Sequence, residues 1–130
     1  MADVYAFRGL RYNRRIVGDL SHIVSPPFDT ISKQLQRSLY QHSSYNVVRL
    51  EAGERMSSDT LADNRYTRSA ALLAEWMANG VLARDISPAL YLVEHIFGHG
   101  DLEMSRLELI ACVRLEEYGN RVVLPHEYTR

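Results

Sequence analysis

The sequence predicts an α+β fold in which an antiparallel β-meander packs against one long and one short helix. Apolar residues recur at helical spacing in the first part of the chain, whereas a period of two, broken by tight turns, dominates the later part. The connections between the later strands are too short for a parallel crossover, which indicates antiparallel pairing. The 130 residues fit one domain, and we therefore expect a single α+β domain over residues 1–130.

A stiff bend at residues 24–32 organises the first part of the chain. It contains two adjacent prolines, each of which fixes φ near −65° and lacks a backbone N–H. Directly after the prolines, Asp29, Thr30 and Ser32 are three candidate N-caps for a short helix over residues 33–42. A carboxylate on a rigid turn beside a helix start suits an active site. It also suits plain capping, which is the more common role of Ser, Thr and Asp before helices.

The middle of the chain predicts a strand, a loop and the long helix. Residues 4–7 open the chain as a strand, and residues 45–50 are expected to form another because valines are frequent there. Residues 51–63 are polar and predict a loop. A helix is then expected over residues 63–79, ended by Gly80 as a C′ glycine. Its predicted buried face consists of Tyr66, Ala70, Leu73, Trp76 and Met77.

Three strands are expected near the end of the sequence. Residues 89–97 predict the first strand and residues 98–101 its turn. Residues 107–115 alternate between apolar and other side chains, which predicts a strand with one strongly apolar face. A second turn at residues 119–120 leads to the third strand, residues 121–124.

Composition excludes several classes of protein. Fifteen basic and sixteen acidic residues give a net charge of −1, which argues against a nucleic-acid partner. The single Cys112 excludes an intrachain disulfide and suits a reducing compartment. It alternates with core positions and is expected to be a buried or half-buried side chain. No signal peptide is recognisable, and no apolar run approaches the ~20 residues that span a bilayer. We expect a cytoplasmic protein without a membrane partner.

Polar residues at the ends of the predicted elements form the candidate site. The expected catalytic residues are Asp29, His126 and Glu127, and the expected substrate- or phosphate-binding residues are Arg8, Asn46, Arg49, Arg65 and Thr129. Arginine forks bind phosphate or carboxylate, and a pair of carboxylates (Asp29 and Glu127) holds Mg²⁺ together with substrate phosphates. His126 or Glu127 alternatively acts as a base. The site requires that the bend and the turn at residues 125–129 share a cleft. Each of these residues is otherwise an ordinary surface or hairpin residue.

Several short segments, taken together, resemble a known family. They are residues 7–12 (FRGLRY), 17–21 (VGDLS), 26–32 (PPFDTIS), 45–50 (YNVVRL), 88–91 (PALY) and 123–127 (VLPHE). In this order they resemble the opening part of the DUF1015 family, over essentially the whole chain. Phe28 stands where the family usually has tyrosine, and Tyr128 where it often has arginine or lysine. The second departure weakens any role for a basic side chain at that turn.

The resemblance implies that the chain is the N-terminal portion of a longer protein. The family is distantly similar to the ParB/sulfiredoxin-like group, which includes free-serine kinases. This kinship implies phosphoryl transfer to a small polar metabolite, with serine as the candidate substrate and ATP or ADP with Mg²⁺ as the cofactor. Two alternatives stay open. One is a non-catalytic ParB-like module that binds nucleotide or nucleic acid. The other is an inactive fragment whose last strand pairs with the missing C-terminal part or with another copy.

Overall fold

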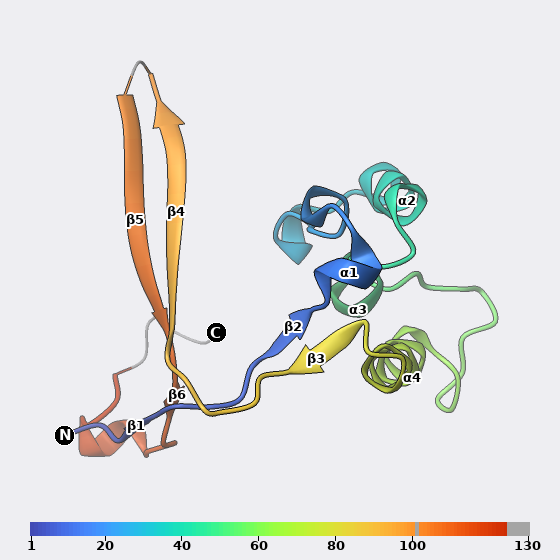
Figure 1. Cartoon of the computed structure of the whole chain (residues 1–130). Helices are drawn as coiled ribbons and strands as arrows, with labels where there is room; N and C mark the ends of the chain where they lie inside the picture. The colour runs from blue at the N-terminus through green and yellow to red at the C-terminus, as the bar shows by residue number, and fades with distance from the viewer. Residues whose placement is uncertain (101, 125–130) are drawn as a thin grey trace. The chain divides into compact units, whose positions relative to one another are not determined.

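The computed structural model describes residues 1–100 and 102–124, which fold into two compact units (Figure 1). The helical unit comprises Leu10–Ala83, and the hairpin unit comprises Met1–Gly9 together with the chain from Arg84 onward. Helices and antiparallel strands are both present, which confirms the α+β class. Each unit is described by itself below.

The helical unit contains four helices and one pair of short strands. The helices are α1 (Arg14–Val17), α2 (Lys33–His42), α3 (Val48–Glu51) and α4 (Arg65–Ala78), with short 3-10 turns η1 (Leu20–His22) and η2 (Phe28–Thr30). Strand β2 (Leu10–Tyr12) pairs with β3 (Leu82–Arg84). The two longer helices lie close to where the sequence predicts them.

Side-chain caps explain where α2 and α4 begin. Ser32 caps α2, because its Oγ accepts a hydrogen bond from the Leu35 N–H at 3.2 Å. Asn64 and Thr67 form a reciprocal capping box at the start of α4. Gly80, at φ 70°, follows the end of α4, as predicted. Of the three candidate caps after the prolines, Ser32 is therefore the one that caps α2.

The core of the helical unit is built around Trp76, which is 3% exposed and packs with Val81 and Leu82. The rings of Tyr12 and Tyr45 lie 5.8 and 6.1 Å from the Trp76 ring, at tilted and edge-on angles. The prediction that Trp76 is a core residue is confirmed.

The prediction that the other residues of this face of α4 are buried is wrong. Tyr66 is 69% exposed, and Leu73 and Met77 are also exposed. The inward side of α4 instead runs along residues 65, 68, 69, 72 and 76. Apolar spacing does not mark this face, because three of its five members are polar. Two of these, Arg68 and Ser69, donate hydrogen bonds to backbone carbonyls.

The predicted strand at residues 45–50 is also wrong, because the segment turns into α3. The Asn46 Oδ1 accepts a hydrogen bond from the Val48 N–H at 3.0 Å, which is an Asx-type turn. Its Nδ2 donates to the carbonyls of His22 and Val24, both at 2.9 Å. These bonds fix the turn and bury Val48 completely, and they outweigh the strand propensity of the valines.

The hairpin unit is dominated by one long antiparallel hairpin. Strand β4 (Tyr91–His99) pairs with β5 (Leu102–Ile110), and β1 (Val4–Tyr5) pairs with β6 (Cys112–Val113). The segment predicted as one strand over residues 107–115 is therefore two strands: its first part belongs to β5, and its second part is β6, which pairs with β1 near the N-terminus. Residues 121–124 do not form the predicted strand; they follow a 3-10 turn, η3 (Tyr118–Asn120), which ends at Arg121 with φ 54°.

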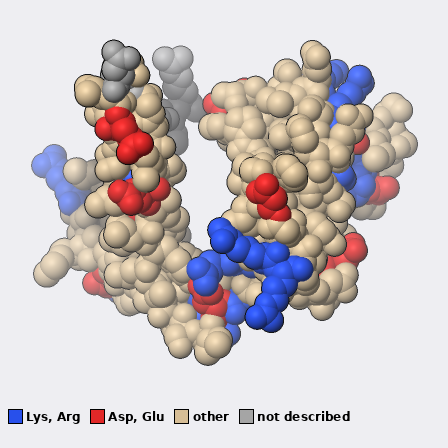
Figure 2. All heavy atoms as spheres, turned by 45° about the horizontal axis from the view of Figure 1, so that its top comes forward, with Lys and Arg blue, Asp and Glu red and all other residues tan. Residues whose placement is uncertain are grey.

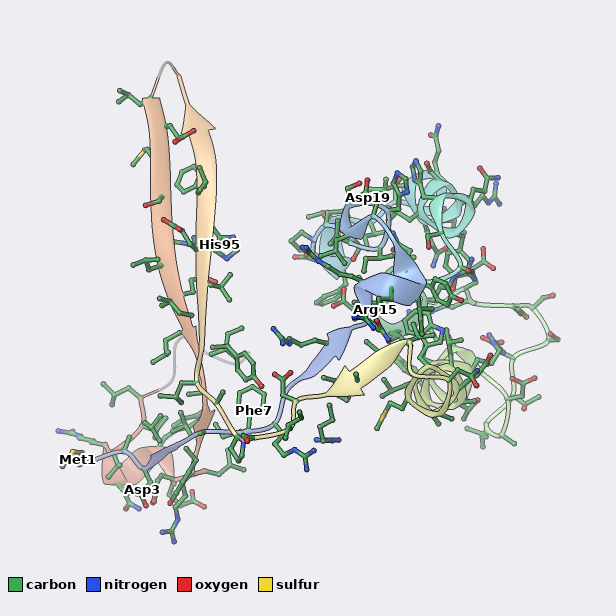
Figure 3. All side chains as sticks on the ribbon, in the orientation of Figure 1. Met1, Asp3, Phe7, Arg15, Asp19 and His95 are labelled. Carbon is green, nitrogen blue, oxygen red and sulfur yellow. The ribbon has the colours of Figure 1, made fainter. Side chains whose placement is uncertain are left out.

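The hairpin exposes most of its apolar side chains. Leu92, Ile96, Leu107 and Leu109 are each more than 60% exposed, and Figure 3 shows side chains standing out on both sides of the two strands. The face of the hairpin that Figure 2 shows is mostly uncharged, with a few acidic side chains. Cys112 is exposed, so its predicted burial is wrong: both residues of β6, Cys112 and Val113, are exposed, and nothing in the described part of the chain covers them.

Candidate functional site

A cleft of about 880 Å³ lies in the helical unit. Its walls come from the end of the proline bend, the first turns of α2, the loop between α3 and α4, and the start of α4. The lining residues are Phe28, Ile31, Lys33, Gln36, Arg37, Glu51, Ala52, Gly53, Glu54, Arg55, Met56, Arg65 and Tyr66. Its volume lies within the usual range of small-molecule pockets.

Basic side chains dominate the charge of the cleft. Lys33, Arg37, Arg55 and Arg65 line it, against the two carboxylates of Glu51 and Glu54. Within residues 1–100 and 102–124, no carboxylate forms an ion pair with any of these four cations. Cations that converge on a hollow without carboxylate partners are available to an anionic ligand.

Hydrogen bonds fix the inner part of the loop that lines the cleft. Gln36 donates from Nε2 to the Ala52 carbonyl at 2.5 Å, and the Glu54 N–H donates to the Tyr40 hydroxyl at 3.1 Å. Gly53 is buried against α4, where an added Cβ would lie 3.2 Å from the Ser69 Oγ. The loop therefore packs closely on α2 and α4, which gives this side of the cleft a defined surface.

Arg65 and Tyr66, at the start of α4, line the cleft as an interacting pair. The Arg65 guanidinium lies 4.5 Å from the centre of the Tyr66 ring, and its Nη2 donates a hydrogen bond to the Tyr66 hydroxyl. This bond, together with the positive charge of Arg65, lowers the pKa of the Tyr66 phenol. The pair places a planar cation and an exposed hydroxyl side by side.

The sequence matches the family described as "Protein of unknown function (DUF1015)" over residues 4–130. The chain belongs to the DUF1015 family. No curated protein and no solved structure matches it. In the part of this DUF1015 protein that the structure describes, no helix is both long and apolar enough to cross a membrane.

The structure brings one of the predicted site residues directly into the cleft. Arg65 lines it, as a phosphate-binding residue would. Asp29 lies between Phe28 and Ile31, two lining residues, and its own side chain is exposed in the first turn of η2. A catalytic or metal-binding role for Asp29 stays a prediction.

Asn46 and Arg49 are held by contacts within the helical unit of this DUF1015 chain. Asn46 is 1% exposed, and both hydrogens of its amide are donated to loop carbonyls. Arg49 donates to the Tyr40 carbonyl at 2.8 Å and to the Ser43 carbonyl at 3.4 Å, and so neutralises the C-terminal end of α2. Their predicted roles in substrate binding have no further support from these contacts.

Arg8, another predicted binding residue, belongs to the hairpin unit. Arg8 donates from Nε to the Asp85 carbonyl at 2.6 Å. His126, Glu127 and Thr129 lie outside the described residues, so the predicted magnesium pair of Asp29 and Glu127 has one member outside them. Within residues 1–100 and 102–124, no three His, Cys, Asp or Glu side chains are placed to hold a metal ion.

Three cationic residues of the cleft were not predicted. Lys33 and Arg37 are four residues apart on α2, and that spacing on a predicted helix is a signal for side chains on one face. Arg55 carried no such signal, because it lies in an irregular loop whose path depends on tertiary contacts.

Proposed function

We propose that this DUF1015 protein binds a small phosphorylated metabolite in the cleft of the helical unit. The observation that carries the proposal is the group of lining cations, Lys33, Arg37, Arg55 and Arg65, none of which is paired with a carboxylate in the described part of the chain. Three of the four are arginines, whose planar forks match the geometry of phosphate oxygens.

The shape and charge of the cleft favour a small ligand over a nucleic acid. Protein surfaces that bind nucleic acids are extended and strongly basic. This cleft is instead a single hollow that is also lined by Glu51 and Glu54. The two carboxylates would repel a continuous polyanion and accept an ammonium or hydroxyl group of a small metabolite. The net charge of −1 agrees with this selection.

The reaction we propose for the site is phosphoryl transfer to a small hydroxyl metabolite, with serine as the candidate acceptor and ATP or ADP with Mg²⁺ as the donor. Phosphoryl transfer depends mainly on positioning and on neutralising charge, which arginine side chains supply. Of the residues predicted from the sequence, Arg65 lines the cleft. Asp29, His126 and Glu127 are proposed as catalytic and metal-binding residues, and Arg8 and Thr129 as binding residues, from the sequence and independently of the cleft. The expected distant similarity of the DUF1015 family to the ParB/sulfiredoxin-like group, which includes free-serine kinases, motivates this assignment, and the cleft supports the binding step.

The binding step is tested by calorimetric titration with pyrophosphate, ADP and serine. R37Q and R55Q are each expected to weaken pyrophosphate binding about tenfold, which is the usual size of one charge-assisted hydrogen bond. R15Q is the matched control, because Arg15 is exposed on α1 of the same unit and does not line the cleft. Equal weakening by all three variants would indicate a general charge effect and would contradict the site.

The transfer step needs its own assay. The protein is incubated with serine, Mg²⁺ and either ATP or ADP, and phosphoserine is measured by mass spectrometry. We expect phosphoserine to form and D29A to abolish it. Nucleotide binding without phosphoserine would leave the non-catalytic binding module as the function and remove the kinase assignment.

A further inference from the structure

The loop between α3 and α4, residues 52–64, contains no helix or strand, yet it supplies Arg55, one of the four cations that line the cleft. Arg55 and Met56 line the cleft from this loop. An irregular segment that presents a binding side chain must be held by contacts from a more rigid element, because free loops lose binding energy when they become ordered.

One side chain on α4 holds this loop at three places. The Arg68 Nη2 donates to the Glu54 carbonyl at 2.9 Å and to the Asp59 Oδ1 at 2.8 Å. Its Nη1 donates to the Asp63 Oδ1 at 2.9 Å. Because Glu54 immediately precedes Arg55 in the chain, the first of these bonds fixes the backbone directly beside the cleft cation.

The environment of Arg68 shows that the Asp59 contact is the more protected of its two ion pairs. The side chains of Arg68 and Asp59 are 31% and 21% exposed, whereas that of Asp63 is 74% exposed. The hydrogen bond from Arg68 is the largest of the causes that lower the pKa of Asp59. Partly shielded charge pairs of this geometry hold their groups more firmly than fully exposed ones.

We propose that Arg68 is a positioning residue that holds Arg55 in place for the anionic ligand. This inference rests on the proposed binding function. Arg68 is not among the residues that line the cleft, so it acts through the loop and makes no contact with ligand. Its planar fork reaches three acceptors at once, which a lysine ammonium on a flexible stem does not reproduce.

The test uses R68K, which keeps the charge near the cleft and removes the fork. R68K is expected to weaken pyrophosphate binding about tenfold, because Arg55 must then be ordered by the ligand itself. Hydrogen exchange should become faster in residues 53–63, while α4 around Trp76 stays protected. The matched control is R15K, for which neither change is expected.

A double-mutant cycle separates positioning from a general structural effect. If Arg68 acts through Arg55, R68K adds no further loss of affinity in an R55Q background, whereas its effect multiplies with that of R37Q. Two outcomes would overturn the inference and leave the proposed function intact. One is that R68K lowers the affinity for pyrophosphate equally in the R55Q and R37Q backgrounds. The other is that R68K alone leaves the affinity unchanged although R37Q and R55Q each lower it. Absence of pyrophosphate binding by the unmodified protein would overturn both.

Discussion

In the helical unit Ile23, Val48 and Trp76 are at most 3% exposed, whereas in the hairpin unit Leu92 and Leu107 are more than 60% exposed. Both units contain regular backbone hydrogen bonding, and β4 pairs with β5 along the full length of both strands. The difference is therefore one of side-chain burial. Regular pairing is present in both units, but a hydrophobic core is present in the helical unit alone among the described residues.

This difference indicates where the stability of the chain resides. Burial of apolar surface is the main favourable term in folding, and a two-stranded hairpin by itself is marginally stable in water. We infer that the helical unit supplies most of the free energy of folding. Its cleft is consequently built on the more stable part of the molecule, as a preorganised binding site requires.

The largest expected effect is that of W76A. Removal of a buried indole leaves a cavity among Val81, Leu82 and the two neighbouring tyrosine rings, and such changes lower the free energy of unfolding by about 3–5 kcal/mol. Urea unfolding followed by far-UV circular dichroism measures the change without relying on tryptophan fluorescence. A loss below about 1 kcal/mol would show that the helical unit does not depend on this core.

The same contrast explains which elements the sequence alone predicts. The helices α2 and α4 were predicted because local signals agree: Ser32 caps one, Gly80 follows the other, and apolar residues recur between such signals. The helix α3 was missed because Asn46 turns the chain through bonds to residues more than twenty positions earlier. Alternation over residues 107–115 likewise predicted a strand, and residues 107–110 do belong to β5, but alternation alone determines neither where the strand begins and ends nor what covers it.

The candidate site was predicted to a smaller extent than the fold. Arg65 was selected and lines the cleft, whereas Lys33, Arg37 and Arg55 were not selected. Convergence of these cations depends on how α2, α4 and the intervening loop pack, and a linear pattern does not contain that information. Arg68 was missed for the same reason, since its three acceptors come from separate places in the loop.

The next expected effect compares one substitution in the two units. Leu39 is 9% exposed in α2, and Leu107 is 61% exposed in β5. L39A is expected to lower the free energy of unfolding by about 2–3 kcal/mol, and L107A by less than about 0.5 kcal/mol, because an exposed leucine leaves no cavity. Urea unfolding of both variants under identical conditions gives the comparison. Equal losses would show that Leu107 is covered in solution, and the assignment of the stabilising core to the helical unit would then be incomplete.

The smallest expected effect is a pH dependence that acts on the helical unit. Tyr12 packs against Trp76 and donates its hydroxyl to the Tyr45 carbonyl at 3.0 Å. Burial, followed by the negative charge of Glu51, raises the pKa of Tyr12 from 10.0 to about 12. The unfolded chain then ionises at a lower pH than the folded chain. The stabilising contribution is consequently complete below pH 10 and is lost as the pH rises from 10 to 12.

Y12F isolates this contribution from that of the other titrating groups. Partial solvent screening reduces the expected loss between pH 10 and 12 to about 1–2 kcal/mol. Between pH 10 and 12 the free energy of unfolding of the unmodified protein should fall by that amount more than the free energy of unfolding of Y12F, because phenylalanine cannot ionise.

Hydrogen exchange locates the loss within the chain. Exchange rates of amides in residues 10–83 are measured near pH 9 and near pH 11, and each rate is corrected for its intrinsic base catalysis. A shift of the same size in β4 and β5 would mean that the two units unfold together, and the separation of a stable helical unit from a marginal hairpin would fail.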